Sequence, residues 1–199
     1  MKQLKVLFCY ILWTQIGFTQ NVPKPLPPLG HSLFVMDFDI HPNSQTYTTA
    51  GIDRKLIAWD IKTGIPFQSI QAHNAEIYSV RYDWMGDTLI TASPDSTVKI
   101  WNSDDLSLLH TIYTGTQNTY AEFSRHNNQI LATGSDGYVK IYDKKTYDLL
   151  HKIKAHEGKV NCAAFTTNGA LVFTGGEDGW VYAYDIKTGK QMFTLDMKA

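Results

Sequence analysis

The sequence predicts an all-β fold in which one small antiparallel sheet occurs four times. Two observations support this: a motif repeats every 41 or 42 residues, and turn-forming residues divide each copy into four short segments. The composition agrees, because aromatic residues make up 13% of the 199 residues and favour strands. A net charge of −1, with 19% charged residues, is typical of a globular protein and argues against a domain built on phosphate contacts.

The repeat is anchored on an aspartate in a short turn of every copy. These aspartates are Asp53, Asp95, Asp136 and Asp178, at spacings of 42, 41 and 42 residues. An aromatic residue follows each of them by six positions: Trp59, Trp101, Tyr142 and Tyr184. A threonine precedes each by four positions, or by three in the third copy: Thr49, Thr91, Thr133 and Thr174. A period of about 40 to 45 residues is typical of a four-stranded blade of a β-propeller.

The fourth copy shows most clearly how a repeat divides into strands. Residues 160–165 form the predicted inner strand, residues 170–174 the second, residues 180–184 the third and residues 191–195 the outer one. Turn residues such as Asn168-Gly169 separate them. The phrase Asp-Ile-Lys-Thr-Gly occurs identically at 60–64 and 185–189, before the last strand, where glycine can adopt a positive φ at little cost.

At these positions the sequence resembles the WD-repeat family of β-propellers. The resemblance rests on Gly30-His31, Trp59-Asp60, the turn aspartates and the period, and it extends over residues 30–199. It implies an all-β propeller with four four-stranded blades, at residues 30–72, 73–115, 116–155 and 156–199.

The resemblance also implies a structural tetrad in each blade, in which a histidine, a threonine, the turn aspartate and an aromatic residue form a hydrogen-bonded chain. The implied tetrads are His31-Thr49-Asp53-Trp59, His73-Thr91-Asp95-Trp101 and His156-Thr174-Asp178-Tyr184. The third blade offers Thr133, Asp136 and Tyr142 but no histidine, with Thr116 or Gln117 near that place, so we expect it to be the least rigid. A buried polar group left unpaired costs about 1–3 kcal/mol, so these residues are expected to stabilise the blades rather than to catalyse a reaction.

Members of this family usually bind partners on the face formed by the starts of the inner strands and by the residue before each turn aspartate. The matching residues are, blade by blade, Ser32, Phe34 and Ile52; Glu76, Tyr78 and Pro94; Gln117, Thr119 and Ser135; and Lys159, Asn161 and Glu177. Phe34 and Tyr78 are aromatic residues of the kind that dominate binding energy at interfaces. A single lysine and no arginine in the set disfavour nucleic acid, so we expect a protein or peptide partner.

Sequence motifs of known catalytic and metal sites are missing, and we expect no enzyme activity, cofactor or metal site in this chain. His151 and His156 are separated by four residues, but the resemblance assigns His156 to a tetrad. Asp37 and Asp39 share one face of a predicted strand, where a solvated edge is the simpler interpretation than an acid–base pair. Cys162 lies in an apolar inner strand and is expected to be a buried, inert thiol.

The first twenty residues resemble a secretory signal peptide, because Lys2 and Lys5 precede an apolar run at residues 6–13. The run is too short to span a bilayer, and Gly17 and Thr19 suit a cleavage site. We therefore predict a signal peptide at residues 1–19, a proline-rich spacer at 20–29 and a secreted or periplasmic mature chain. Without export, the chain would be cytoplasmic.

Four blades are fewer than the family's common ring of about seven, so the sequence predicts a partial ring or one that a second chain completes by self-association. Three functions remain open at this point. The first is an exported, non-catalytic scaffold for protein interactions. The second is the N-terminal propeller of a larger enzyme, such as a protease or kinase, with its catalytic domain beyond this chain. The third is an intracellular WD-repeat scaffold.

Overall fold

The computed structural model describes residues 30–196 as four antiparallel sheets of four strands each, with no helix in this range. This confirms the predicted all-β class and the four repeated sheets. The predicted signal peptide at 1–19 and the spacer at 20–29 lie outside the described residues.

Each sheet is one blade, and its four strands are consecutive in the sequence. Blade 1 consists of β1 (Val35–Ile40), β2 (Thr46–Gly51), β3 (Lys55–Asp60) and β4 (Pro66–Gln71). Blade 2 consists of β5 (Ser79–Tyr82), β6 (Thr88–Ala92), β7 (Thr97–Asn102) and β8 (Leu108–Tyr113). Blade 3 consists of β9 (Asn118–Phe123), β10 (Gln129–Gly134), β11 (Tyr138–Asp143) and β12 (Leu149–Lys154). Blade 4 consists of β13 (Val160–Phe165), β14 (Leu171–Gly176), β15 (Trp180–Asp185) and β16 (Gln191–Asp196).

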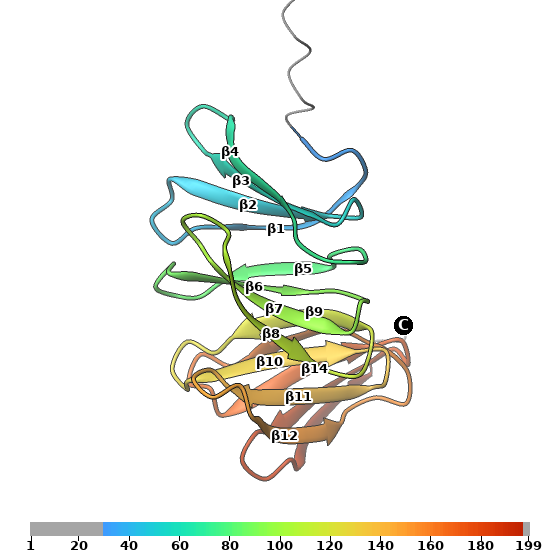
Figure 1. Cartoon of the computed structure of the whole chain (residues 1–199). Coiled ribbons are helices and arrows are strands. Elements are labelled where there is room, and N and C mark those ends of the chain that lie inside the picture. The colour runs from blue at the N-terminus through green and yellow to red at the C-terminus, as the bar shows by residue number, and fades with distance from the viewer. Residues whose placement is uncertain (1–29, 197–199) are drawn as a thin grey trace, which may run out of the picture.

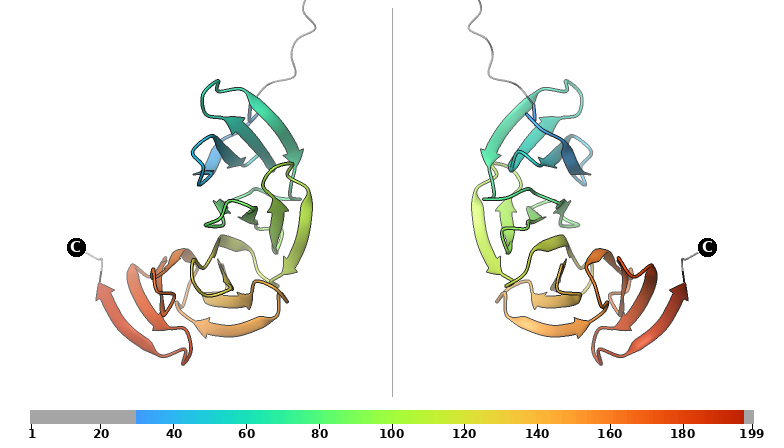
Figure 2. Two further views of the ribbon diagram at one scale, coloured as in Figure 1. Left: turned by 90° about the vertical axis from the view of Figure 1, so that its left-hand side faces the viewer. Right: turned by 90° about the vertical axis from the view of Figure 1, so that its right-hand side faces the viewer.

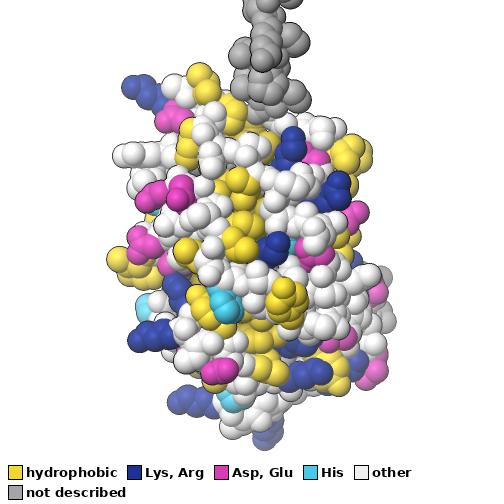
Figure 3. Space-filling view, in the orientation of Figure 1, with side chains coloured by type: hydrophobic (Ala, Val, Ile, Leu, Met, Phe, Trp, Pro, Cys, Tyr) yellow, Lys and Arg dark blue, Asp and Glu magenta, His cyan; other side chains and the backbone are white. Residues whose placement is uncertain are grey.

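The blades stand side by side and together form an open arc (Figures 1 and 2). The first strand of each blade lies on the concave side, and the fourth strand lies on the convex rim (Figure 2). Blade 1 and blade 4 are the two ends of this arc. The convex side carries a broken line of hydrophobic side chains among scattered charges of both signs (Figure 3).

Residues with left-handed backbone close the turns that the sequence marked. Gly64 and Gly189, at the ends of the two identical five-residue phrases, have φ values of 66° and 65°. The residue after each turn aspartate is also left-handed: Arg54, Ser96, Gly137 and Gly179, with φ between 68° and 82°. All four turns therefore have the same backbone shape, although two of them lack the glycine that adopts it most readily.

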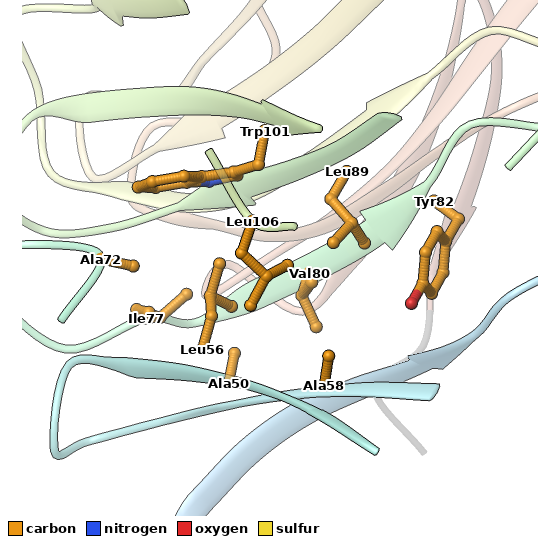
Figure 4. Packing of buried hydrophobic residues seen from close by; sticks show 10 residues of the cluster. All are labelled: Ala50, Leu56, Ala58, Ala72, Ile77, Val80, Tyr82, Leu89, Trp101 and Leu106. Atoms are coloured by element: carbon orange, nitrogen blue, oxygen red, sulfur yellow. The ribbon is translucent and has the colours of Figure 1, made fainter. Parts of the chain in front are cut away.

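Apolar packing joins neighbouring blades to one another. Between blades 1 and 2, a cluster combines Ala50 and Leu56 with Val80, Leu89 and Trp101 (Figure 4). Similar clusters join blade 2 to blade 3 and blade 3 to blade 4. We call the side that a blade turns to the next blade its leading face, represented by Ala50 and Leu56 in blade 1. The opposite side, represented by Val80 and Trp101 in blade 2, is its trailing face.

Directed hydrogen bonds between inner strands add to this packing. Asp37 accepts the amide of Val80 at 3.0 Å, and Asp39 accepts the amide of Tyr82 at 2.8 Å. Asp37 also pairs with Arg81. The same arrangement recurs further along the arc, from Ala121 N–H to Ser79 and from Phe165 N–H to Glu122. The expectation that Asp37 and Asp39 form a solvated edge is therefore wrong, because both carboxylates bind the next blade.

In blades 1 and 2 the four tetrad side chains lie within hydrogen-bond distance of one another. In blade 1, His31 Nδ1 is 2.8 Å from Asp53, His31 Nε2 is 2.8 Å from the Thr49 hydroxyl, and the Trp59 indole donates to that hydroxyl at 2.8 Å. The corresponding distances in blade 2 are 2.9, 2.7 and 2.9 Å, for His73–Asp95, His73–Thr91 and Trp101–Thr91. An imidazole that donates through Nδ1 leaves Nε2 to accept the threonine hydroxyl, so one neutral histidine satisfies both neighbours.

Burial and hydrogen bonding set the charge state of the blade 2 tetrad. Burial lowers the pKa of His73 in spite of the neighbouring Asp95 carboxylate. The lowered pKa keeps the imidazole neutral near pH 7. Burial alone would raise the pKa of Asp95, but hydrogen bonds from His73 and Thr97 outweigh it and hold that pKa well below its usual range. The tetrad is therefore a carboxylate bound by neutral donors.

Blade 4 departs from the implied tetrad at its aromatic residue. His156 binds Asp178 and Thr174, each at 2.9 Å, as the resemblance implies. The Tyr184 hydroxyl, however, donates to the backbone carbonyl of Ala155 at 2.9 Å. The phenol extends further than the indole N–H, so it passes Thr174 and binds the residue before the histidine.

Blade 3 is built differently, and the expected role of Thr133 is wrong. In blade 1 the tetrad residue Thr49 pairs across the sheet with the residue four positions after the turn aspartate. In blade 3 the residue with that pairing is Ala132, opposite Lys140. Thr133 instead binds the hydroxyl of Thr119 at 3.0 Å. Thr133 precedes its turn aspartate by three positions rather than four, and this spacing was the sequence signal of its different place.

Lys140 takes the place of the missing imidazole. Its side chain is 4% exposed, and its ammonium lies 2.7 Å from Asp136 and donates to the carbonyl of Thr114 at 3.1 Å. Thr116, which the sequence places near the missing histidine, bonds Ser135 at 3.2 Å. An ion pair therefore holds the turn of blade 3, where a histidine relay holds the others.

Replacing the tetrad carboxylate should destabilise the whole arc. We expect Asp95→Ala to lower the free energy of unfolding by about 3 kcal/mol, because it leaves buried hydrogen-bond donors on His73 and Thr97 without an acceptor. The exposed Asp104 of the same blade is the matched control, and Asp104→Ala should change stability by less than about 0.5 kcal/mol. Urea unfolding followed by circular dichroism measures both. Equal midpoints for the two variants would contradict the structural role.

Removing the lysine of blade 3 should have a comparable effect. Lys140→Met keeps the apolar stem but leaves Asp136 without its cation, and we expect a loss of about 2 kcal/mol or more. Lys145→Met, at an exposed loop position of the same blade, is the control and should be nearly neutral. If Lys140→Met unfolds at the same urea concentration as Lys145→Met, then Lys140 does not replace the histidine.

Candidate partner-docking face

The turns after β2, β6, β10 and β14 lie at the same end of each blade as the starts of the inner strands. The tetrads fix this proximity, because the turn aspartate also binds the backbone beyond the histidine. Asp53 accepts the amide of Ser32 at 2.9 Å, and Asp95 accepts the amide of Asn74 at 3.0 Å. Residues from two separate segments of each blade are thereby held at one end of the arc. This end is the candidate docking face.

Blade 1 contributes the most exposed part of this face. Phe34 is 76% exposed, and Ser32 is exposed beside it. Ile52 is half-buried, and its amide donates to the carbonyl of Phe34 at 2.9 Å. Leu33, which lies between Ser32 and Phe34 in the sequence, is 58% exposed. The sequence did not single it out. Blade 1 therefore presents two adjacent apolar side chains to solvent.

Blades 2 and 4 meet across the concave side. The ammonium of Lys159 lies 5.7 Å from the centre of the Tyr78 ring, a cation–π contact between the two blades. Both residues are half-buried, as are Glu76 and Pro94 of blade 2. Blade 4 adds two exposed residues, Asn161 and Glu177. Tyr78 and Lys159 are therefore joined in one part of the face, although the sequence could not show their contact.

Blade 3 contributes less than the sequence predicts. Gln117 and Ser135 are exposed, but Thr119 is only 7% exposed and contacts the carbonyl of Val160 in blade 4. Thr119 is the extra residue of a register shift at the start of β9, where Gly134 pairs with Asn118 while Thr133 pairs with Tyr120, and blade 4 covers it. The structure therefore removes Thr119 from the docking face.

A shallow hollow of about 650 Å³ lies between blades 1 and 2 at this end. Its lining includes three of the predicted docking residues, Ser32, Ile52 and Glu76, together with Leu33 and Arg54. Apolar, hydroxyl and oppositely charged groups thus surround one depression. Such a mixture suits a protein or peptide surface better than a polyanion.

Of the residues considered as catalytic candidates, His156 belongs to a tetrad, and Asp37 and Asp39 bind blade 2. Between residues 30 and 196, no group of three or more His, Cys, Asp or Glu side chains is placed to hold a metal ion. No helix in that range is long and apolar enough to cross a membrane. Cys162 is exposed, so the expectation that it is buried is wrong. Its inner strand belongs to blade 4, whose leading face is not covered by a following blade among residues 30–196.

The comparisons with known proteins agree with the fold. The family model described as "WD domain, G-beta repeat" matches residues 24–60, 64–102, 109–143 and 147–185. A solved structure titled "Structure of U3-55K" superposes with a TM-score of 0.76 at 19% identity. The superposition covers 83% of this chain and 53% of that one.

Curated relatives are about a quarter identical to this chain over the aligned residues. WD repeat-containing protein 1 of Gallus gallus is 27% identical over 168 residues, which is 80% of this chain and 28% of the relative. The probable coatomer subunit beta' of Schizosaccharomyces pombe is 28% identical over 84% of this chain and 21% of its own length. The eukaryotic translation initiation factor 3 subunit I of Bombyx mori is 26% identical over 71% of this chain and 47% of its own length.

The chain therefore spans less than half the length of each of these relatives. The four matches of the family model cover most of the sequence, and each of the last three runs from the outer strand of one blade through the first three strands of the next. The chain belongs to the WD40 repeat family.

Proposed function

We propose that this chain is a non-catalytic scaffold that binds a protein or peptide partner on the docking face. The observation that carries the proposal is the pair of exposed apolar residues, Leu33 and Phe34, beside the hollow between blades 1 and 2. Exposed aromatic residues near a depression are the usual anchors of protein interfaces. The tetrads hold the backbone of this face in place, which lowers the ordering cost of binding.

The charge of the face and the names of the relatives support the same function. Glu76, Glu177 and Lys159 give the face both signs of charge, which favours a mixed protein surface over nucleic acid. Two of the relatives are by name subunits, of coatomer and of a translation initiation factor. A role as one component of a larger assembly fits a chain that offers a binding surface.

Truncating the two aromatic anchors should abolish partner capture. We expect Phe34→Ala/Tyr78→Ala to reduce recovery of a specific partner at least about tenfold in quantitative pull-downs from the source organism, since each anchor contributes about 2 kcal/mol or more. Phe67→Ala/Tyr113→Ala is the matched control, because it removes a Phe from blade 1 and a Tyr from blade 2 on the outer strands.

Thermal unfolding of all three proteins separates loss of binding from loss of fold. Capture that is equal for the intact chain and the Phe34/Tyr78 variant would contradict the docking face. Capture lost only in the Phe67/Tyr113 variant would place the binding surface on the convex rim instead.

We also propose that the chain is exported, on the basis of residues 1–19 alone. Cleavage after Thr19 would give a mature protein that begins at Gln20. N-terminal sequencing of the protein recovered from the periplasm or medium is expected to find this start. An intact Met1 in protein recovered from the cytosol would refute export while leaving the docking face untouched.

A further inference from the structure

The two ends of the arc expose opposite sides of the same repeated contact. Blade 1 has no preceding blade among the described residues, so its trailing face is open. Blade 4 has no following blade among them, so its leading face is open. Between blades, a leading face always packs on a trailing face, as in the cluster of Ala50 and Leu56 with Val80 and Trp101.

The trailing face of blade 1 carries, at Phe38, a larger side chain than later blades have at the equivalent inner-strand position. Phe38 occupies the position that Val80, Ala121 and Ala163 occupy in blades 2, 3 and 4, as the pairing with the second strand shows. Phe38 is 60% exposed, whereas Val80 is fully buried. Ile40 is 51% exposed beside it, and the rings of Tyr47 and Trp59 stack nearby, 5.9 Å apart. The Phe38 side chain therefore projects from this face.

On the leading face of blade 4, the inner strand carries side chains that are smaller than their equivalents. Ala164 stands where blades 1, 2 and 3 have Asp39, Arg81 and Glu122. Cys162 stands where blade 1 has Asp37. Together with Phe173, Gly175 and Val181 these residues line an apolar hollow of about 220 Å³. This face is therefore recessed, at the level where blade 1 projects.

The two open faces also match in their hydrogen-bonding groups. The inner-strand amides of Tyr82 and Phe165 need carboxylates from the preceding blade, supplied by Asp39 and Glu122. The equivalent amide of blade 1, that of Ile40, already donates to its own neighbour Asp39 at 2.9 Å. A blade that packs on blade 1 therefore needs no hydrogen-bond acceptor opposite the Ile40 amide. Blade 4 has Ala164 at that position, and an alanine side chain offers no acceptor.

From these matches we propose that a second copy of this chain covers both open faces. Blade 4 of each copy packs on blade 1 of the other, so that the Phe38 region of one enters the Cys162–Ala164 hollow of its partner. Two such contacts, related by a two-fold axis, close the arcs into one ring of eight blades, at the upper end of the range of about four to eight. The proposal does not depend on the docking face.

The test is the mass of the full chain in solution, measured by sedimentation velocity over a wide range of concentration. We expect a dimer whose mass stops increasing at twice that of the monomer. Phe38→Asp puts a charge on the projecting face, and Ala164→Arg fills the hollow. Each substitution is at an exposed position and should weaken dimerisation at least tenfold while the circular dichroism spectrum stays unchanged. Leu108→Asp, on the exposed rim, is the matched control and should remain dimeric.

Mixing the two monomeric variants distinguishes the head-to-tail arrangement from all others. A mixture of Phe38→Asp and Ala164→Arg retains one intact contact, between blade 4 of the first and blade 1 of the second, so a mixed dimer should reappear. A monomer at every concentration would overturn the proposal. This outcome includes the case in which the chain's own terminal segments cover these faces. Disruption by only one of the two substitutions, or assemblies that grow beyond a dimer, would overturn it too.

Discussion

Every blade depends on its neighbours, because a four-stranded sheet has two faces and cannot cover either of them by itself. Each of the three apolar clusters draws on adjoining blades, and Leu56 of blade 1 is buried only because blade 2 packs on it. Carboxylates and hydroxyls on the inner strands then bind amides of the next blade, as Asp39 does for Tyr82. Buried amides of this kind must find partners, so these bonds also fix the register between the blades.

The polar groups inside each blade link this packing to function. In blade 2, Asp95 binds His73 and the backbone that follows it, and so keeps the start of the inner strand beside the turn. The candidate docking face consists of those two segments. Blade 3 reaches a similar result with the ion pair of Lys140 and Asp136, which shows that the requirement is a satisfied turn carboxylate rather than a histidine. Stability and binding surface thus depend on the same side chains.

The sequence predicted the repeat, the four strands of each blade and the polar residues that meet in blades 1 and 2, because these follow from spacing along one chain. It failed for Thr133 because this residue follows Ala132, the one that pairs with Lys140, and successive strand residues face opposite sides of a sheet. It failed for Thr119 because blade 4 covers that residue. It failed for Cys162 and for Asp37, because burial there is decided by the presence or absence of another blade. The contact of Lys159 with Tyr78 was beyond sequence reasoning, since it joins blades that are far apart in the chain.

A blade is stable only where a neighbour covers it, and hydrogen-exchange mass spectrometry of the monomeric Phe38→Asp variant measures this dependence. Blades 2 and 3 are covered on both faces, whereas blades 1 and 4 are each covered on one. We expect amides of β6, β7, β10 and β11 to exchange at least about tenfold more slowly than those of β2, β3, β14 and β15. Equal protection in all four blades would contradict it, because each blade would then be stable without its neighbours.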